Sequence, residues 1–363
     1  MEGRAPARPS RTGVAGAPLS TLTGALGGLF VSLLFSTSSF ATPIQPSACA
    51  QAAKYSEARH GTAVLVIQNG QTVFERYANG GGPDAAWPIF SGTKNFWGIA
   101  ALVAISEGLF HLDDNVSDTI TEWRGDPRKS KITIRQLLTF TDGLDPASFL
   151  HRDSLADRNA LALKVASVAQ PGAAFTYGPS HPQVFCELLR RKLNGGSTFA
   201  YLQQRVLGPL GIGSFEYKQD SKGNPLFATG FHLSARQWVR LGQMILGHGS
   251  FNGHQVVPGE LLQQAFVGTS ANPSYGLSFW LNRTSGFLSS EADIEKRLDL
   301  KWNRASWRGI CISKAAPADM IAAIGSHYQR MFVIPSMNLV IVRESSADAK
   351  FSDGEFLRLI LKR

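Results

Sequence analysis

Cysteine is scarce in this sequence, and the few cysteines do not suggest a covalent framework. The 363 residues include only Cys49, Cys186 and Cys311, an odd number that cannot pair fully within one chain. Cys49 is interpreted as an unpaired residue near the start of the chain, and pairing of the other two is left open. Neither the cysteines nor the eight scattered histidines have the spacing of metal ligands. We therefore expect neither a metal nor any other cofactor.

Concentrated charge is also missing. The formal net charge is +9, but the positive residues are scattered along the chain. Their densest cluster, RGDPRKSK at 124–131, is short and has no interleaved aromatic residues. Nucleic-acid binding is therefore not expected.

Long hydrophobic runs are absent apart from one near the N-terminus. Three arginines among the first eleven residues precede the apolar stretch LTGALGGLFVSLLF at 22–35, which is too short to span a bilayer. The sequence SFA then ends at Ala41 and fits the small-x-small cleavage rule. We predict that 1–41 is a signal peptide cut after Ala41, followed by a mature N-terminal segment at 42–59. The protein is then exported, either to the periplasm or into the medium, and has no stable membrane span.

What the rest of the chain does contain is strand signals at both ends with helical patterns between them. Two alternating runs at 62–78 meet at Asn69–Gly70, a strong hairpin signal. From 115 to 265 the pattern is largely helical. Further strands are expected at 275–282, 320–328, 330–335 and 338–345, and a helix at the C-terminus.

This order predicts an α/β (α+β) fold. An antiparallel β-sheet flanked by helices would be built from 60–114 together with 310–363, and 115–309 would form a large helical insertion domain. No internal repeat interrupts this organisation.

The segment PIFSGTKNFWGIAALVAI at 88–105 contains a misplaced charge. From Phe96 onward it reads as a helix that is apolar almost all round, which predicts burial. Lys94 lies in its first turn, three residues after Ser91, although cations are unfavourable at that end of a helix. At this spacing the two side chains meet, and burial would lower the lysine pKa so that the amine can act as a base. The position then makes sense if Ser91 is a nucleophile.

The alternative is chance, because about one Ser-x-x-Lys is expected in a chain of this size. The surrounding order of segments argues against chance. IFSGTKNFWGIAALVAISEGLF (89–110), ITIRQLLTFTDGLD (132–145), FTYGPSHPQVFCELLRRKL (175–193) and AIGSHYQRMFVIPSMNLVIVRES (323–345) follow one another. This series resembles the β-lactamase-related serine hydrolases, which include class C β-lactamases, D,D-peptidases, esterases and nylon-oligomer hydrolases. The resemblance implies a β-lactamase/penicillin-binding-protein-like fold and hydrolysis of a small-molecule or peptide ester or amide.

Site residues follow from the resemblance position by position. Ser91 matches the nucleophile, Lys94 its partner and Tyr177 the second-motif tyrosine, whose phenol can relay protons if the lysine lowers its pKa. The backbone N–H groups of Ser91 and Ser326 would form the oxyanion hole. Three further residues are candidates for substrate binding: Gly325, His327 and Trp280. Trp280 can also be a core residue, and His327 an exposed strand residue.

Two departures from the family pattern leave a second interpretation open. Pro179 occupies the asparagine position of the second motif, where Ser180 is a candidate replacement. Ala323 and Ile324 precede Gly325 where the family offers a Lys or His, so that any cation must come from His327 or Arg330. The alternative to an enzyme is a non-catalytic module that binds cell-wall peptide on the same fold.

Overall fold

A computed structural model describes residues 42–283, 289–298, 307–347 and 350–362, which belong to one compact unit. The predicted signal peptide at 1–41 lies outside the described residues. Within these ranges, no helix combines the length and the apolar character needed to cross a bilayer.

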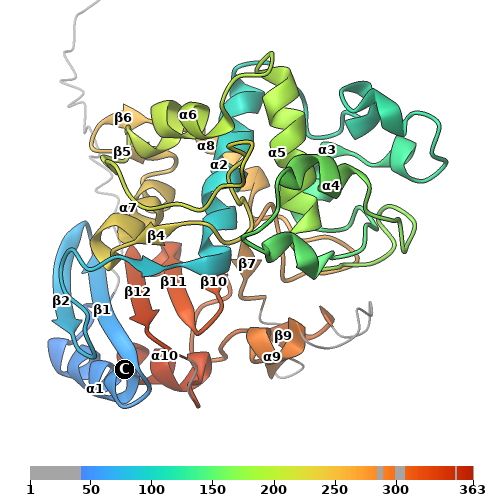
Figure 1. Cartoon of the computed structure of the whole chain (residues 1–363). Helices are drawn as coiled ribbons and strands as arrows, with labels where there is room; N and C mark the ends of the chain where they lie inside the picture. Colours follow the sequence, from blue (N-terminus) through green and yellow to red (C-terminus); the bar gives the residue numbers. More distant parts are fainter. Residues whose placement is uncertain (1–41, 284–288, 299–306, 348–349, 363) are drawn as a thin grey trace, which may run out of the picture. The chain divides into compact units, whose positions relative to one another are not determined.

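One antiparallel sheet joins strands from the two ends of the chain, as the sequence predicts. Its strand order is β2-β1-β12-β11-β10-β7, and every neighbouring pair is antiparallel (Figure 1). The strands are β1 (Gly61–Gln68), β2 (Gln71–Tyr77), β7 (Trp280–Leu281), β10 (Ile321–Gly325), β11 (Gln329–Ile334) and β12 (Leu339–Ser345). Two-residue strands pair elsewhere: β3 (Trp87–Pro88) with β4 (His232–Leu233), β5 (Ser250–Phe251) with β6 (His254–Gln255), and β8 (Ser290–Glu291) with β9 (Ile310–Cys311).

The predicted hairpin is confirmed, whereas two strand predictions are too long. Asn69 and Gly70 both have positive φ, of 51° and 74°, which matches the twist of a two-residue hairpin turn. The strand expected over 275–282 is reduced to β7, and the one expected over 320–328 ends at Gly325. The last change matters for the site, because a turn replaces the strand there.

Helices cover both faces of the sheet. In Figure 1, α1 and α10 lie on one face of the sheet, and α7 lies on the other with α2 beyond it. The α-helices are α1 (Pro46–Glu57), α2 (Thr93–Ser106), α3 (Ile134–Thr139), α4 (Arg158–Leu163), α5 (Ser180–Lys192), α6 (Thr198–Leu202), α7 (Ala235–Leu246), α8 (Gly259–Gln264), α9 (Ile294–Leu298) and α10 (Asp353–Leu361). Short helical turns are η1 (Phe90–Gly92), η2 (Val116–Asp118), η3 (Thr121–Trp123), η4 (Lys129–Lys131), η5 (Ser148–His151) and η9 (Pro335–Met337), with a π-helical turn η6 (Gln203–Leu207) after α6.

α1 was not expected. It buries Cys49 fully, and this cysteine is unpaired, as its interpretation from the sequence has it. Cys186 and Cys311 are also buried, and both are free thiols, so no disulfide links them. The fold is therefore held by its core.

The buried helix predicted after Ser91 is confirmed as α2. Every residue from Thr93 to Ala104 is buried. An apolar helix of this kind must be enclosed by other elements, and here it lies between the sheet side and the helical region (Figure 1). Its N-terminus, with Lys94, is therefore fixed by packing from all sides.

Candidate active site

Ser91 lies in the middle of the tight turn η1, directly before α2. The preceding residue, Phe90, has φ of 44°, a left-handed conformation that is unfavourable for a bulky side chain. Such strain persists only where the surroundings fix the backbone. The Phe90 ring packs against His327, with ring centroids 5.0 Å apart.

Lys94 reaches back to Ser91 and is enclosed. Its Nζ lies 2.9 Å from Ser91 Oγ and donates to the carbonyl oxygen of Ala228 at 2.8 Å. The side chain is only 2% exposed, and burial lowers the lysine pKa to about 7. Near neutral pH a large fraction of Lys94 is therefore an uncharged amine that can accept a proton.

Tyr177 joins the pair from the loop before α5. Lys94 Nζ lies 4.8 Å from the centre of its ring. Burial raises the tyrosine pKa to about 12, against the opposite effect of a hydrogen bond with Ser91. Burial outweighs that hydrogen bond, so the pKa of Tyr177 is raised and not lowered. Tyr177 is therefore a protonated phenol near neutral pH.

The end of β10 brings Ser326 to the nucleophile turn. A Cβ on Gly325 would lie 2.1 Å from the carbonyl oxygen of Ile89, so only glycine allows this approach. After Gly325 the chain turns, with φ of 59° at His327 and 57° at Tyr328. His327 is thus a turn residue, and the strand alternative is wrong.

One cleft of about 770 Å³ is lined by five of the predicted site residues: Ser91, Lys94, Tyr177, Ser326 and His327. The candidate Gly325 is not among its lining residues. The walls of the cleft come from both the sheet side and the helical region. They are formed by Ser91, Lys94, Ser148, His151, Tyr177, Gly178, Pro179, Thr229, Glu295, Lys296, Leu298, Ser326, His327, Tyr328 and Lys350.

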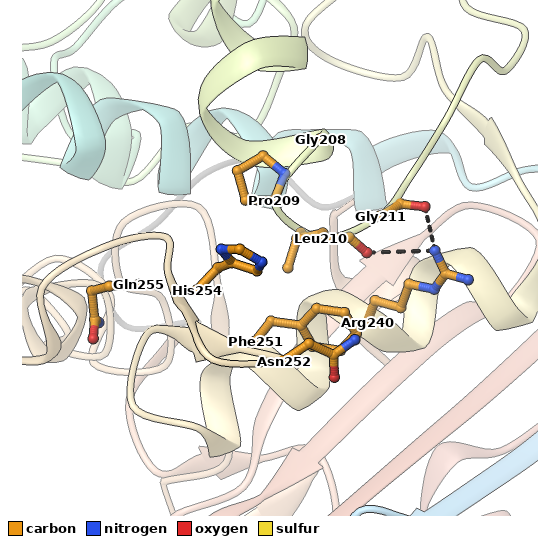
Figure 2. A pocket seen from close by; sticks show the side chains of 9 residues that line it. All are labelled: Gly208, Pro209, Leu210, Gly211, Arg240, Phe251, Asn252, His254 and Gln255. Carbon is orange, nitrogen blue, oxygen red and sulfur yellow. Dashed lines mark hydrogen bonds between the residues drawn. The ribbon is translucent and has the colours of Figure 1, made fainter.

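A second depression contains none of the predicted site residues. Figure 2 shows it between the loop after η6 and the β5–β6 hairpin. Arg240 donates there to the carbonyl oxygens of Leu210 and Gly211. Nothing in this lining forms a nucleophile–base pair. Across the part of the chain that the structure describes, no group of three or more His, Cys, Asp or Glu residues is placed to hold a metal ion.

The fold and this cleft agree with the comparison with known proteins. The family model described as Beta-lactamase matches residues 47–358, which is most of the chain. The chain belongs to the beta-lactamase family. The predicted resemblance and fold class are thereby confirmed, and membership supports hydrolase activity.

The sequences of individual relatives have low identity to this beta-lactamase family member. Protein flp of Staphylococcus aureus (strain MRSA252) is 26% identical over 191 residues, 48% of this chain and 38% of flp. Lovastatin esterase of Penicillium rubens is 26% identical over 202 residues, 46% of this chain and 50% of the esterase. The matches thus span half or less of these relatives. The crystal structure of a D-stereospecific amidohydrolase from Streptomyces sp. has the same fold, with a TM-score of 0.63 and 16% identity over 87% of this chain and 98% of the other.

This family member departs from the family pattern at the asparagine position of the second motif, which is occupied by Pro179. Pro179 precedes α5 and lines the cleft. Ser180 does not replace the missing amide, because it is buried and its hydroxyl donates to the carbonyl oxygen of Asp145 at 2.6 Å. Instead, the carbonyl oxygen of Ala228 supplies a second partner for Lys94.

His181 also faces away from the cleft. It is fully buried in the first turn of α5 and its Nδ1 lies 2.7 Å from Oδ2 of Asp142, which is equally buried. This pair ties α5 to the loop after α3. Asp142 also accepts from the backbone N–H of Leu144 at 2.7 Å, a contact typical of a turn.

Two of the substrate-binding candidates prove to be core residues. Trp280 is 2% exposed and packs with its ring centroid 5.7 Å from that of Tyr177, so it supports the tyrosine from behind. Arg330 is fully buried and ion-paired with Asp353 and Glu295. Neither is among the residues that line the cleft described above.

The cleft contains polar groups that sequence reasoning missed. His151 and Thr229 face it together, with His151 Nδ1 3.2 Å from Thr229 Oγ1. Lys296 and Lys350 add cations from α9 and from the segment before α10. None of these lies in a recognisable motif, and no local signal in the sequence could have identified them.

Proposed function

We propose that this protein is an exported serine hydrolase that cleaves an ester or amide bond through an acyl-enzyme on Ser91. The observation that carries the proposal is the buried Lys94 amine 2.9 Å from the Ser91 hydroxyl, with a pKa of about 7. A serine hydroxyl becomes a nucleophile only when a neighbouring base takes its proton. An uncharged amine at this distance meets that requirement.

Acylation begins with transfer of the hydroxyl proton from Ser91 to the lone pair of Lys94 Nζ. The serine oxygen attacks the substrate carbonyl carbon, and the oxyanion accepts hydrogen bonds from the backbone N–H groups of Ser91 and Ser326. The bond to the leaving group then breaks. Tyr177 donates its phenolic proton to that group and recovers one from the Lys94 ammonium.

Deacylation repeats the sequence with water as the nucleophile. Water gives a proton to the Lys94 amine as its oxygen attacks the acyl carbon. Collapse of the second tetrahedral intermediate releases the carboxylic acid and returns a proton to Ser91. The net reaction is hydrolysis, and the scheme uses no cofactor.

The proteins similar to this chain include an esterase and an amidohydrolase, which supports a substrate class of both esters and amides. Export is supported by the basic N-terminus and the apolar stretch before Ala41. The N-terminal sequence of protein recovered outside the cytoplasm tests it, because cleavage at the proposed site gives Thr42 as the first residue.

A fluorophosphonate probe tests the acyl-enzyme directly. We expect the intact mass of the wild type to increase by one adduct, and Ser91→Ala to show no adduct and no hydrolysis of p-nitrophenyl butyrate. Ser148→Ala is the matched control, because Ser148 lines the same cleft but Lys94 donates to Ser91 and to the Ala228 carbonyl oxygen instead. It should label and turn over like the wild type.

Absence of both labelling and turnover in the folded wild type would favour the alternative, a peptide-binding module. That alternative is motivated by Pro179 and by the missing third-motif cation at Ala323–Ile324. Its own test is calorimetric titration with a cell-wall stem peptide, which must then bind in the Ser91 cleft.

A further inference from the structure

Arg330 is a buried charge that the proposed mechanism does not use. Its side chain has no exposed surface. Its Nε lies 2.7 Å from Oδ1 of Asp353 at the start of α10, and its Nη1 lies 2.9 Å from Oε1 of Glu295 on α9. Burial opposes the charge, yet the two carboxylates raise the arginine pKa above its ordinary value. The guanidinium is therefore a fixed cation.

A further contact of this cation reaches the end of β10. Arg330 Nη1 donates to the carbonyl oxygen of Gly325 at 2.8 Å. The Gly325 carbonyl and the Ser326 N–H belong to one peptide unit. That unit is planar, so a hydrogen bond that orients the carbonyl also orients the N–H on the opposite side.

The same bond changes the strength of the N–H as a donor. Hydrogen bonds from a charged donor are about twice as strong as neutral ones. Bonds in series polarise one another, so a cation on the carbonyl oxygen makes the N–H of that peptide more positive. A more positive N–H stabilises a developing oxyanion more than it stabilises the neutral substrate carbonyl.

We propose that Arg330 is a positioning residue for the oxyanion hole, which it serves by orienting and polarising the Gly325–Ser326 peptide. The inference rests on the proposed function, in which the Ser326 N–H is an oxyanion donor. Gly325 is fixed from its other side as well, by its close approach to the Ile89 carbonyl. The peptide is thus held between the nucleophile turn and the arginine. The carboxylates of Asp353 and Glu295 in turn hold the guanidinium in place.

The test compares Arg330→Lys with Ile360→Ala. Lysine retains a buried cation but lacks the forked donors that reach both carboxylates and the Gly325 carbonyl. Alanine at 360 removes a buried side chain two turns along α10 from Asp353 and leaves the charged residues in place, so it controls for lost stability. For each variant, kcat and KM with p-nitrophenyl butyrate are measured, together with the Tm and the Ki of an alkyl boronic acid. The boronate adduct is tetrahedral and places an oxygen in the oxyanion hole.

For Arg330→Lys we expect kcat to fall by about 10-fold to 100-fold, because complete loss of one oxyanion donor costs about 10²–10³-fold. KM should stay within threefold, and the boronic acid Ki should rise in parallel with the loss in kcat. Ile360→Ala should keep kcat within threefold although its Tm falls. If Arg330→Lys does not fold, the double variant Arg330→Met/Asp353→Asn removes the cation with its main counter-ion and is compared with Ile360→Ala instead.

The outcomes separate this inference from the proposed function. If the wild type hydrolyses the ester, Ser91→Ala does not, and the arginine variant keeps kcat within threefold of Ile360→Ala, the role of Arg330 alone is refuted. Equal losses in both variants that follow the fall in Tm would also refute it, since they indicate a structural role only. A wild type without hydrolysis overturns both proposals.

Discussion

Replacing Lys94 by methionine should inactivate the protein and at the same time make it more stable. Burial lowers the lysine pKa from 10.5 to about 7. Each pKa unit corresponds to about 1.4 kcal/mol, so holding the protonated form in the fold costs about 5 kcal/mol as an upper estimate. Methionine has a similar length and no charge, and it avoids that cost. Its loss of the bonds to Ser91 and Ala228 offsets part of the gain, which leaves an expected stabilisation of a few kcal/mol at pH 6.

The gain must depend on pH in a defined direction. Below pH 7 both the folded and the unfolded chain carry a protonated lysine, so the folded state bears the full cost. Between pH 7 and 10.5 the unfolded state binds more protons, and wild-type stability therefore rises with pH. The advantage of Lys94→Met should accordingly be largest at pH 6 and shrink by about 1.4 kcal/mol per unit above pH 7.

Activity should follow the same titration. If the neutral amine is the base, kcat/KM of the wild type rises with pH through an apparent pKa near 7 and is about 100-fold lower at pH 5 than at its plateau. Urea unfolding from pH 6 to 9 measures the stability, and p-nitrophenyl butyrate hydrolysis measures the activity. Lys222→Met, at an exposed lysine, is the control and should change neither. A flat activity profile between pH 5.5 and 8.5, or a Lys94→Met variant less stable than wild type at pH 6, would refute the reasoning.

Three further predictions concern neighbouring parts of the site. Tyr177→Phe keeps the ring packing and removes the hydroxyl, so kcat should fall by about 10²–10⁴-fold with little change in Tm; a variant within threefold of wild type would make the tyrosine structural. Gly325→Ala places a methyl group 2.1 Å from the Ile89 carbonyl oxygen, so both Tm and kcat should fall, whereas Gly125→Ala, where no atom lies within 4 Å, should be neutral. Equal behaviour of the two alanine variants would contradict that reading. Nitrocefin, which carries a carboxylate, should have a lower kcat/KM than p-nitrophenyl butyrate. The Lys296 side chain in the cleft is 77% exposed, and an ion pair between such a surface charge and the carboxylate contributes about 1 kcal/mol at most. A clear preference for nitrocefin would show that the cleft binds carboxylates strongly.

Features set by neighbouring residues were predictable from the sequence. The hairpin at Asn69–Gly70 depends on two residues that tolerate positive φ. The contact between Ser91 and Lys94 depends on a spacing of three residues at a helix start. Burial of α2 follows from its lack of a polar face. These properties are encoded within a few residues, so no knowledge of the rest of the fold is needed.

Properties that depend on distant segments were decided only by the tertiary structure. The carbonyl oxygen that holds Lys94 belongs to Ala228, 134 residues further along the chain. Arg330 was a candidate cation for substrate until the structure enclosed it between Asp353 and Glu295. Trp280 likewise became a support for Tyr177.

The pKa values of the site residues also depend on the tertiary structure. The sequence placed a lysine beside a serine and predicted the direction of the lysine's pKa shift. For Tyr177 the sequence offered only the condition that the lysine lower its pKa. Burial raises this pKa instead, because Phe140, Tyr275 and Trp280 enclose the ring from segments far away in the sequence. Local spacing determines which side chains are neighbours on one helix, whereas the solvent exposure that sets a pKa depends on every segment that packs around them.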